Sequence, residues 1–423
     1  MKNINSSTLS NGMRIYTLQK EGKLFSLNLG LNIGAMAESQ EEKGICHFIE
    51  HMVFKGTQFD DNESLNFKIE NLGGDFNAYT DFFKTVFTVS ALKDELEPSL
   101  TILRDMLMYP NFKKEDLDKE KTVILSELRA SLDDQEEMTH KNLFEKAYDE
   151  SPLKYDVIGT EESILSFTTE QIASFYKKTY GPEQTVLVLV SAYAHDEVVS
   201  LIEKLFYEWP KNHFKMNSLE FEKNIPGTHE SYKDMEQSSL GLLYTFSMED
   251  EDKLPIRVLN YKLGVSGNAI LFRELREKRG LVYDVYSDID LTKNVQQLLI
   301  YTQVSDENLD LVEEQVLAIL EDLKKGIYLK DHDLELLKKV MKTSVYDTLE
   351  NIHDLSSTML EEIFNEEEPL SVLNDLEKLE KLTLNDLLEM SPRLFQNPTI
   401  YRRRGDRCRK FWRLTKINEI RIE

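Results

Sequence analysis

The chain has 423 residues, of which 41% are apolar and 30% charged, a balance typical of folded globular proteins. Asp and Glu outnumber Lys and Arg by 76 to 51, and the net charge of −25 argues against nucleic acid or an anionic membrane surface as the main partner. The sequence has no apolar run long enough to span a bilayer, no pattern of a secretory signal, and only two cysteines. We therefore expect a cytoplasmic protein in a reducing compartment.

The length exceeds that of one ordinary core, so we expect two domains of about 200 residues each. Residues 25–35 (FSLNLGLNIGA) alternate apolar and polar side chains, which predicts a strand with one buried face. The apolar stretch at 44–54 predicts a helix. The elements expected after it are a pair of strands over 70–92, helices over 96–107 and 113–148, a buried strand over 185–193 and a helix over 195–209.

The second half repeats part of this order, because a glycine turn, two strands and an apolar helix follow one another over 280–326 as they do over 73–107. Strands grouped with helices, rather than strictly alternating with them, favour an α+β fold. We predict two homologous domains, each a mainly antiparallel sheet with helices packed on it. The predicted boundaries are 1–209 for the N-terminal domain, 210–226 for a linker, and 227–423 for the C-terminal domain.

The stretch GICHFIEHMVF (44–54) carries three titratable side chains in an otherwise apolar segment. On a helix His47 and His51 lie one turn apart on the same face, and Glu50 falls within the same arc. Two imidazoles at this spacing can bind one Zn²⁺, and a carboxylate beside them can take a proton from water. This is the H-x-x-E-H arrangement of the inverzincins. The alternative is a pair of hydrogen-bonded histidines on a half-buried helix.

A catalytic zinc site needs a third protein ligand. The segment KEDLDKEKTVILSELRASL (114–132) offers Glu120 and Glu127, which are seven residues apart and therefore share a helix face. An acid on an apolar face favours a counter-charge, which a metal would supply. Acids are abundant on this helix, so spacing alone leaves Glu127 as one candidate among several.

With these motifs the chain resembles the insulinase/pitrilysin family of zinc metallopeptidases, and more closely its small members, similar to the mitochondrial processing peptidase subunits and their bacterial relatives. HFIEH matches the zinc motif of the family. Glu127 lies 76 residues beyond His51, where the family has its third ligand, and Glu120 stands at the position of a supporting acid. The resemblance implies one zinc ion per chain, bound by His47, His51 and Glu127.

Two further segments carry the resemblance. GGDFNAYT (73–80) is similar to the segment whose edge strand binds the substrate backbone, through Asn77 and Ala78. LFRELREKRGLVYDVYS (271–287) is similar to the second-half signature, in which Arg276 and Tyr283 contact the substrate near the scissile bond. The second half has no H-x-x-E-H motif, as expected of a degenerate domain.

The resemblance implies an endopeptidase that hydrolyses short or unfolded peptides by water attack, with Glu50 as the base and Tyr283 stabilising the oxyanion. Family members enclose peptides in a chamber, and a chain of this size supplies half of it, so we expect a dimer in which Arg276 and Tyr283 serve the partner's zinc site. Because one chain carries both motifs, a homodimer is favoured over a heterodimer with a related subunit.

Alternative functions are a dedicated protease that removes leader or targeting peptides and, less favoured, a non-catalytic structural subunit. The acidic composition fits either a plainly solvated surface or a preference for basic peptides. Two local features remain open. Residues 401–423, with nine Lys or Arg and three acids, form a basic tail without an assigned role, and Cys46 is either a small buried residue or a redox-sensitive thiol.

Overall fold

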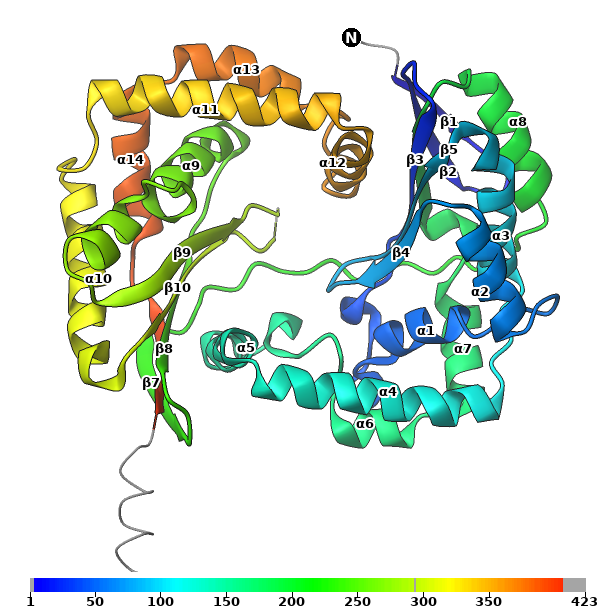
Figure 1. Ribbon diagram of the computed structural model, residues 1–423, viewed down its shortest axis with the longest axis horizontal. Coiled ribbons are helices and arrows are strands. Elements are labelled where there is room, and N and C mark those ends of the chain that lie inside the picture. The colour runs from blue at the N-terminus through cyan, green and yellow to red at the C-terminus, as the bar shows by residue number, and fades with distance from the viewer. Residues whose placement is uncertain (1–3, 293, 406–423) are drawn as a thin grey trace, which may run out of the picture. The chain divides into compact units, whose positions relative to one another are not determined.

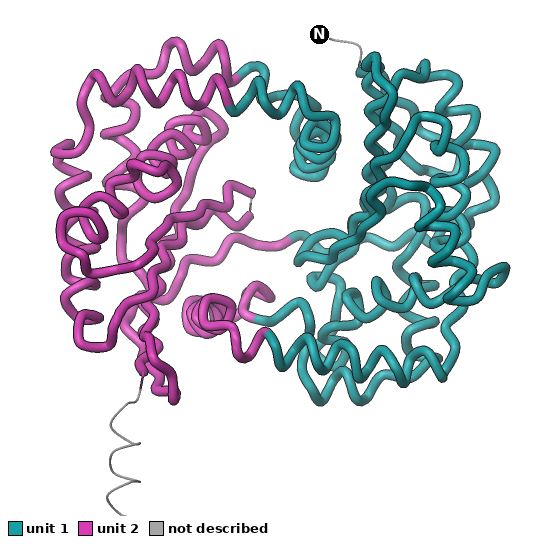
Figure 2. The backbone as a smooth tube through the Cα atoms, viewed as in Figure 1, with its two compact units in different colours: residues 1–130, 155–218, 344–374 teal, residues 131–154, 219–343, 375–423 magenta. Residues whose placement is uncertain are grey.

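The computed structural model describes residues 4–292 and 294–405, which form two compact units (Figure 2). Of the described residues, the first unit comprises 4–130, 155–218 and 344–374, and the second comprises 131–154, 219–292, 294–343 and 375–405. Each is a sheet with helices packed on it, which confirms the predicted α+β class. The units differ from the predicted contiguous domains by two exchanged segments, residues 131–154 and 344–374.

A six-stranded sheet in the order β1-β2-β6-β3-β5-β4 forms the first unit (Figure 1). Neighbouring strands are antiparallel except β2 and β6, and β4 lies at one edge, where it pairs with β5 alone. The strands are β1 (Ile4–Thr8), β2 (Arg14–Gln19), β3 (Leu24–Leu31), β4 (Asp75–Thr80), β5 (Thr85–Leu92) and β6 (Thr185–Ser191).

The helices of the first unit bury apolar side chains in a core that includes Phe48, Ile49, Leu103 and Phe206. Its helices are α1 (Ile45–Val53), α2 (Asn62–Asn71), α3 (Leu96–Met108), most of α4 (Lys114–Asp133), α6 (Glu161–Ser166), α7 (Thr169–Thr179), α8 (His195–Phe206) and α12 (Ile352–Phe364). The helix predicted over 113–148 is wrong as one element, because it breaks at Asp134. The Asp134 side chain accepts hydrogen bonds from the backbone N–H groups of Glu136 and Glu137 and so begins a new helix, α5 (Gln135–Ala147).

The second unit repeats the plan with a five-stranded sheet in the order β7-β11-β8-β10-β9. As in the first sheet, one pair of strands is parallel, here β7 with β11, and the rest are antiparallel. The strands are β7 (Gly227–Lys233), β8 (Ser238–Thr245), β9 (Val282–Asp290), β10 (Gln297–Val304) and β11 (Thr399–Gly405). The helices are α5, α9 (Lys253–Asn260), α10 (Leu309–Lys324), the first part of α11 (Asp331–Glu350), most of α13 (Val372–Lys381) and α14 (Leu384–Leu394).

In each unit a helix distant in sequence covers one face of the sheet: α12 packs on β3 and β6, and α5 packs on β8 and β11 (Figure 1). The predicted single buried face of the strand at 25–35 is therefore wrong, since its polar side chains are buried under α12. Ser356 on α12 lies 2.7 Å from the Ser26 hydroxyl and accepts a hydrogen bond from the Asn28 amide at 2.7 Å. Gly30 allows this approach, because a Cβ there would lie 2.5 Å from the ring of Phe364.

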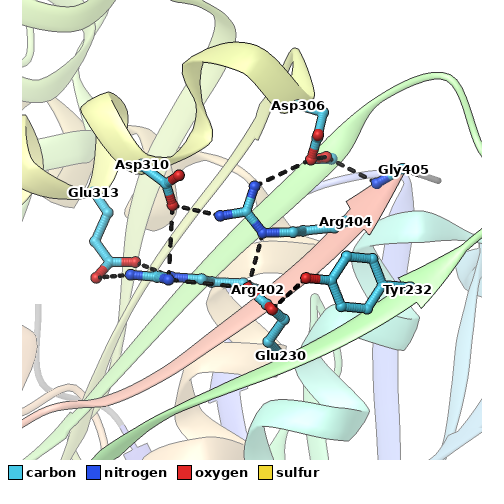
Figure 3. A network of polar contacts seen from close by, with 9 residues as sticks. Glu230, Tyr232, Asp306, Asp310, Glu313, Arg402, Arg404 and Gly405 are labelled. Carbon is cyan, nitrogen blue, oxygen red and sulfur yellow. Dashed lines mark hydrogen bonds and ion pairs between the residues drawn. The ribbon is translucent and has the colours of Figure 1, made fainter. Parts of the chain in front are cut away.

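The basic residues at the start of the predicted tail belong to strand β11, inside the second sheet. Arg402 donates two hydrogen bonds to Glu313, at 2.6 and 2.7 Å, and Arg404 contacts Glu230 at 2.8 Å and also Asp310 (Figure 3). Acids from β7 and α10 thus neutralise Arg402 and Arg404. The rest of the predicted tail, residues 406–423, lies outside the described residues. Within the described ranges, none of the helices is long and apolar enough to cross a membrane.

Candidate metal centre

Helix α1, which carries three of the predicted site residues, begins at Gly44 with a left-handed φ of 91°. A glycine has no side chain to cap the helix, and Glu38 takes that role. Its carboxylate accepts hydrogen bonds from the N–H groups of Gly44 and Cys46, each at 3.0 Å. Cys46 itself is buried, and its thiol contacts the carbonyl oxygen of Gly34 at 3.2 Å.

The start of α1 is also fixed by a close backbone contact with the loop before α6. Gly44 and Gly159 pack against each other, and both have φ near +90°. A Cβ on Gly44 would lie 2.2 Å from the carbonyl oxygen of Ile158, and one on Gly159 would lie 2.4 Å from that of Lys43. No side chain fits at either position, so two glycines are required to place α1 here.

His47, His51 and Glu127 are brought together, with one potential ligand atom of each lying within 4.8 Å of the other two. His47 Nε2 is 3.7 Å from Glu127 Oε1, and His51 Nε2 is 3.6 Å from Glu127 Oε2. Both separations are too long for a hydrogen bond. The ligand atoms of a tetrahedral zinc ion, bound at about 2.0–2.1 Å, lie about 3.3 Å apart, so the spacing of these three groups fits a zinc ion better than direct contacts.

The protonation of His47 fits the same donor set. His47 is only 9% exposed, and burial together with the neighbouring His51 lowers its pKa to about 4. Its imidazole is therefore neutral at pH 7, the form that binds a metal. The two rings lie edge to face, with centroids 4.7 Å apart. Two imidazoles facing a carboxylate are a donor set of the kind zinc takes.

Glu120 supports His51 from the side away from Glu127. Its carboxylate lies 3.1 Å from His51 Nδ1 and 2.9 Å from Lys55 Nζ. Burial acts to raise the pKa of Glu120, but the hydrogen bonds from His51 and Lys55 outweigh it and hold the pKa below its ordinary value. An ionised Glu120 fixes Nδ1 of His51 as the donor and leaves Nε2 as the atom aimed at Glu127.

Glu50 lies on the same helix beside the ligand cluster. Burial raises the pKa of Glu50 against the opposing effect of a hydrogen bond that Oε2 accepts from the Thr80 hydroxyl at 2.6 Å. A carboxyl group with a raised pKa is suited to exchange protons at neutral pH.

Asn77 and Ala78 lie on β4, the edge strand nearest α1. Because β4 pairs only with β5, its other edge has backbone groups that no neighbouring strand within the described residues takes up. Asn77 is exposed, and its side-chain oxygen accepts a hydrogen bond from the N–H of Ala78 at 2.9 Å. The structure therefore puts the predicted substrate-binding pair on a free sheet edge.

Arg276 and Tyr283 lie together in the second unit, and not in the unit that holds the ligand cluster. Arg276 lies in the last turn of a π-helical segment, η8 (Phe272–Glu277), and its guanidinium stacks over the rings of Phe272 and Tyr283 at 4.7 and 5.0 Å. Tyr283 is 76% exposed on the edge strand β9. Their substrate contacts stay a prediction.

Three residues that support the cluster were not predicted from the sequence. Lys55 stands four residues after His51, and this helical spacing is a signal that points to it. Thr80 ends the segment GGDFNAYT, on the same side of the strand as Ala78. Glu38 gives no local signal, since its contacts with the start of α1 depend on how the preceding turns fold.

Comparison with known proteins finds matches in both halves of the chain. Residues 14–161 match the family model described as insulinase (peptidase family M16), and residues 166–341 match the one described as peptidase M16 inactive domain. The chain is 31% identical to an uncharacterized zinc protease of Rickettsia felis over 74% of its own length and 77% of that protein. It is 30% identical to the uncharacterized zinc protease YmxG of Bacillus subtilis, over 83% of its own length and 85% of that protein.

A further relative matches about half of the chain, and a solved structure matches its fold. The mitochondrial-processing peptidase subunit beta of Dictyostelium discoideum is 32% identical over 47% of this chain and 43% of that one. A protease of known structure from Helicobacter pylori superimposes with a TM-score of 0.88 at 21% identity, covering 96% of this chain and all of that one. The sheets and helices thus have the fold of this protease. The chain belongs to the insulinase family, peptidase family M16.

Proposed function

We propose that the protein is a zinc-dependent endopeptidase that hydrolyses short or unfolded peptides. The observation that carries the proposal is the cluster of His47, His51 and Glu127, with Glu50 beside it on the same helix. The zinc protease names of the relatives from Rickettsia felis and Bacillus subtilis support the metal and the reaction class. Each chain would hold one zinc ion, which supplies Lewis acidity toward the scissile carbonyl and acidifies water.

The residues of this chain then divide the remaining work. Glu50 takes a proton from the attacking water and returns it to the leaving amine. Glu120 keeps the His51 ring in one tautomer and orientation, and Lys55 holds Glu120 in its ionised form. Burial of His47 keeps its imidazole neutral, so that its nitrogen lone pair is available at pH 7.

The substrate would bind as an extra strand on the free edge of β4. Backbone groups of Asn77 and Ala78 would pair with an extended peptide, which explains a requirement for short or unfolded substrates, since a folded protein rarely offers a free extended segment. Backbone pairing of this kind selects for conformation more than for sequence.

Arg276 and Tyr283 would contact the substrate from a second chain. An exposed tyrosine hydroxyl is able to donate a hydrogen bond to the oxygen that becomes negative in the transition state. We propose a homodimer that encloses the substrate, with a heterodimer with a related subunit as the alternative. Analytical ultracentrifugation of the purified chain distinguishes them, because a chain that stays monomeric alone contradicts the homodimer.

A second candidate is a dedicated protease for leader or targeting peptides. The likeness to a mitochondrial-processing peptidase subunit beta over half of the chain favours it. Such an enzyme would cut one precursor and leave an unrelated mixture of unfolded peptides intact. A third candidate, a structural subunit without activity, is opposed by the presence of His47, Glu50, His51 and Glu127 together.

The test compares the wild type with Glu127→Gln and Glu115→Gln, two matched changes on helix α4. Glu115 is exposed at the start of the helix and far in sequence from the cluster. We expect the wild type and Glu115→Gln to bind about one zinc ion per chain and cut unfolded peptides, and Glu127→Gln to lose both properties. Zinc bound equally by all three proteins would contradict the assignment of Glu127.

A further inference from the structure

The edge strand β4 ends at a residue that contacts the proposed base. Thr80 Oγ1 lies 2.6 Å from Glu50 Oε2. An ionised carboxylate only accepts hydrogen bonds, so Thr80 is the donor. The other carboxylate oxygen, Oε1, has no hydrogen-bond partner among the residues that the structure describes. One oxygen of Glu50 is therefore held by the protein and the other is left for a substrate or water.

The position of the Thr80 hydroxyl is itself fixed. Thr80 pairs with Thr85 across the β4–β5 hairpin, and their hydroxyls are 3.2 Å apart. Thr85 is completely buried and donates to the carbonyl oxygen of Ile33 at 2.9 Å. The turn between the two threonines is closed by Asp81, whose side chain accepts hydrogen bonds from the N–H groups of Phe83 and Lys84 at 2.7 and 2.8 Å. The backbone pairing with Thr85 and the turn closed by Asp81 thus place this hydroxyl against Glu50. Its single proton goes to Glu50 and that of Thr85 goes to Ile33, so the two hydroxyls are in contact without a hydrogen bond between them.

Alternation along β4 places Thr80 on the same face as Ala78 and Phe76. Phe76 meets Phe54, at the end of α1, with ring centroids 6.0 Å apart, so this face packs toward α1. The strand whose free edge would take the substrate is therefore the strand whose last residue contacts Glu50.

We propose that Thr80 is a positioning residue for Glu50, which orients the carboxylate so that Oε1 accepts the proton of the attacking water. This inference rests on the proposed peptidase function and deepens it. Because one hydrogen bond joins the base to the substrate-binding strand, a peptide paired with Asn77 and Ala78 is placed in a fixed register relative to Oε1. Thr80 thereby links binding of the peptide backbone to the chemical step.

The kinetic test uses Thr80→Val, which replaces the hydroxyl by a methyl group of similar size, and Thr80→Ser, which restores the hydroxyl. We expect kcat of Thr80→Val to fall about tenfold to a hundredfold, the effect of one hydrogen bond to a charged group. KM and zinc content stay at the wild-type values, and Thr80→Ser recovers most of the rate. A wild-type kcat in Thr80→Val, or a loss confined to KM or zinc content, would overturn the proposal.

The matched control is Thr179→Val. Thr80 is partly buried and Thr179 is completely buried in the same unit, but the Thr179 hydroxyl donates to the carbonyl oxygen of Phe175 at 2.7 Å and has no contact with Glu50. We expect this variant to lose some stability and to keep kcat. An equal fall of kcat in both variants would mean that the loss reflects packing and would contradict a positioning role for Thr80.

A structural test does not depend on activity. Crystal structures of zinc-loaded wild type and Thr80→Val should show the Glu50 carboxylate hydrogen-bonded to Thr80 in the first and rotated away in the second. A carboxylate that stays in place without the hydroxyl would refute the inference. If the carboxylate moves but the wild type cuts no peptide, the positioning contact stands and the proposed function fails.

Discussion

Glu38 provides a quantitative prediction about the helix that carries the metal ligands. The side chain is 8% exposed, and burial, opposed by the two hydrogen bonds from the start of α1, raises its pKa from 4.5 to about 7. Lys43 lies beside it and acts in the opposite direction to burial, as do the hydrogen bonds. A folded state with the higher pKa binds the proton more tightly than the unfolded state does.

The sign of the pH dependence follows from this difference. The proton bound by Glu38 stabilises the folded state at low pH, and the stabilisation is lost as the pH rises from about 4.5 to about 7. A difference of about 2.5 pKa units corresponds to about 3 kcal/mol. We therefore expect the free energy of unfolding of the wild type, measured relative to Glu38→Gln, to fall by about 3 kcal/mol between pH 4.5 and pH 8.

Urea unfolding of both proteins at several pH values measures this difference, with Glu41→Gln as the control. Glu41 is exposed three residues away, and its replacement should leave the free energy of unfolding unchanged at every pH. The reasoning is refuted if the difference between wild type and Glu38→Gln is constant with pH. It is also refuted if the wild type gains stability relative to Glu38→Gln as the pH rises, because the pKa of Glu38 in the folded state would then lie below its ordinary value.

Three further predictions concern single contacts. Glu120→Gln should weaken zinc binding about 10- to 100-fold in a competition titration, and unchanged affinity would contradict its supporting role. Gly159→Ala should lower the free energy of unfolding by more than about 2 kcal/mol, because backbone strain at a positive φ and a clash with Lys43 act together. Gly73 also has a positive φ but lies in open space, so Gly73→Ala should cost only about 1 kcal/mol. Equal costs would contradict the packing argument. Arg402→Met leaves the buried Glu313 unpaired and should cost about 1–3 kcal/mol in urea unfolding, and no loss would mean that the pair is not stabilising.

The part of the site that follows from local spacing could be predicted from the sequence. His47, Glu50 and His51 lie on one turn of α1, so helical periodicity alone puts them together. The approach of Glu127 depends on packing of α4 against α1, and periodicity indicated only that Glu120 and Glu127 share a face. The resemblance to a family, and not the spacing, selected Glu127 as the third ligand.

Contacts between distant segments account for what the sequence did not reveal. Alternation along β3 indicated a polar face open to water, but Ser26 on that face is paired with Ser356, 330 residues away. Thr80 meets Glu50 across 30 residues through a hairpin whose geometry no short pattern specifies. The basic residues of β11 were predicted to belong to a tail because Lys and Arg outnumber acids over 401–423. The acidic partners of Arg402 and Arg404 come from β7 and α10. In each case the partner that neutralises or buries a polar group is supplied by tertiary structure.

The central claim is that α1 and α4 form a zinc site that activates water for peptide hydrolysis with Glu50 as the base. The most direct measurement determines bound zinc in the wild type and in Glu50→Gln, and follows the cleavage of an unfolded peptide mixture by both. We expect about one zinc ion per chain in each protein and cleavage by the wild type alone. Cleavage by Glu50→Gln at the wild-type rate, or absence of zinc from both proteins, would contradict the claim.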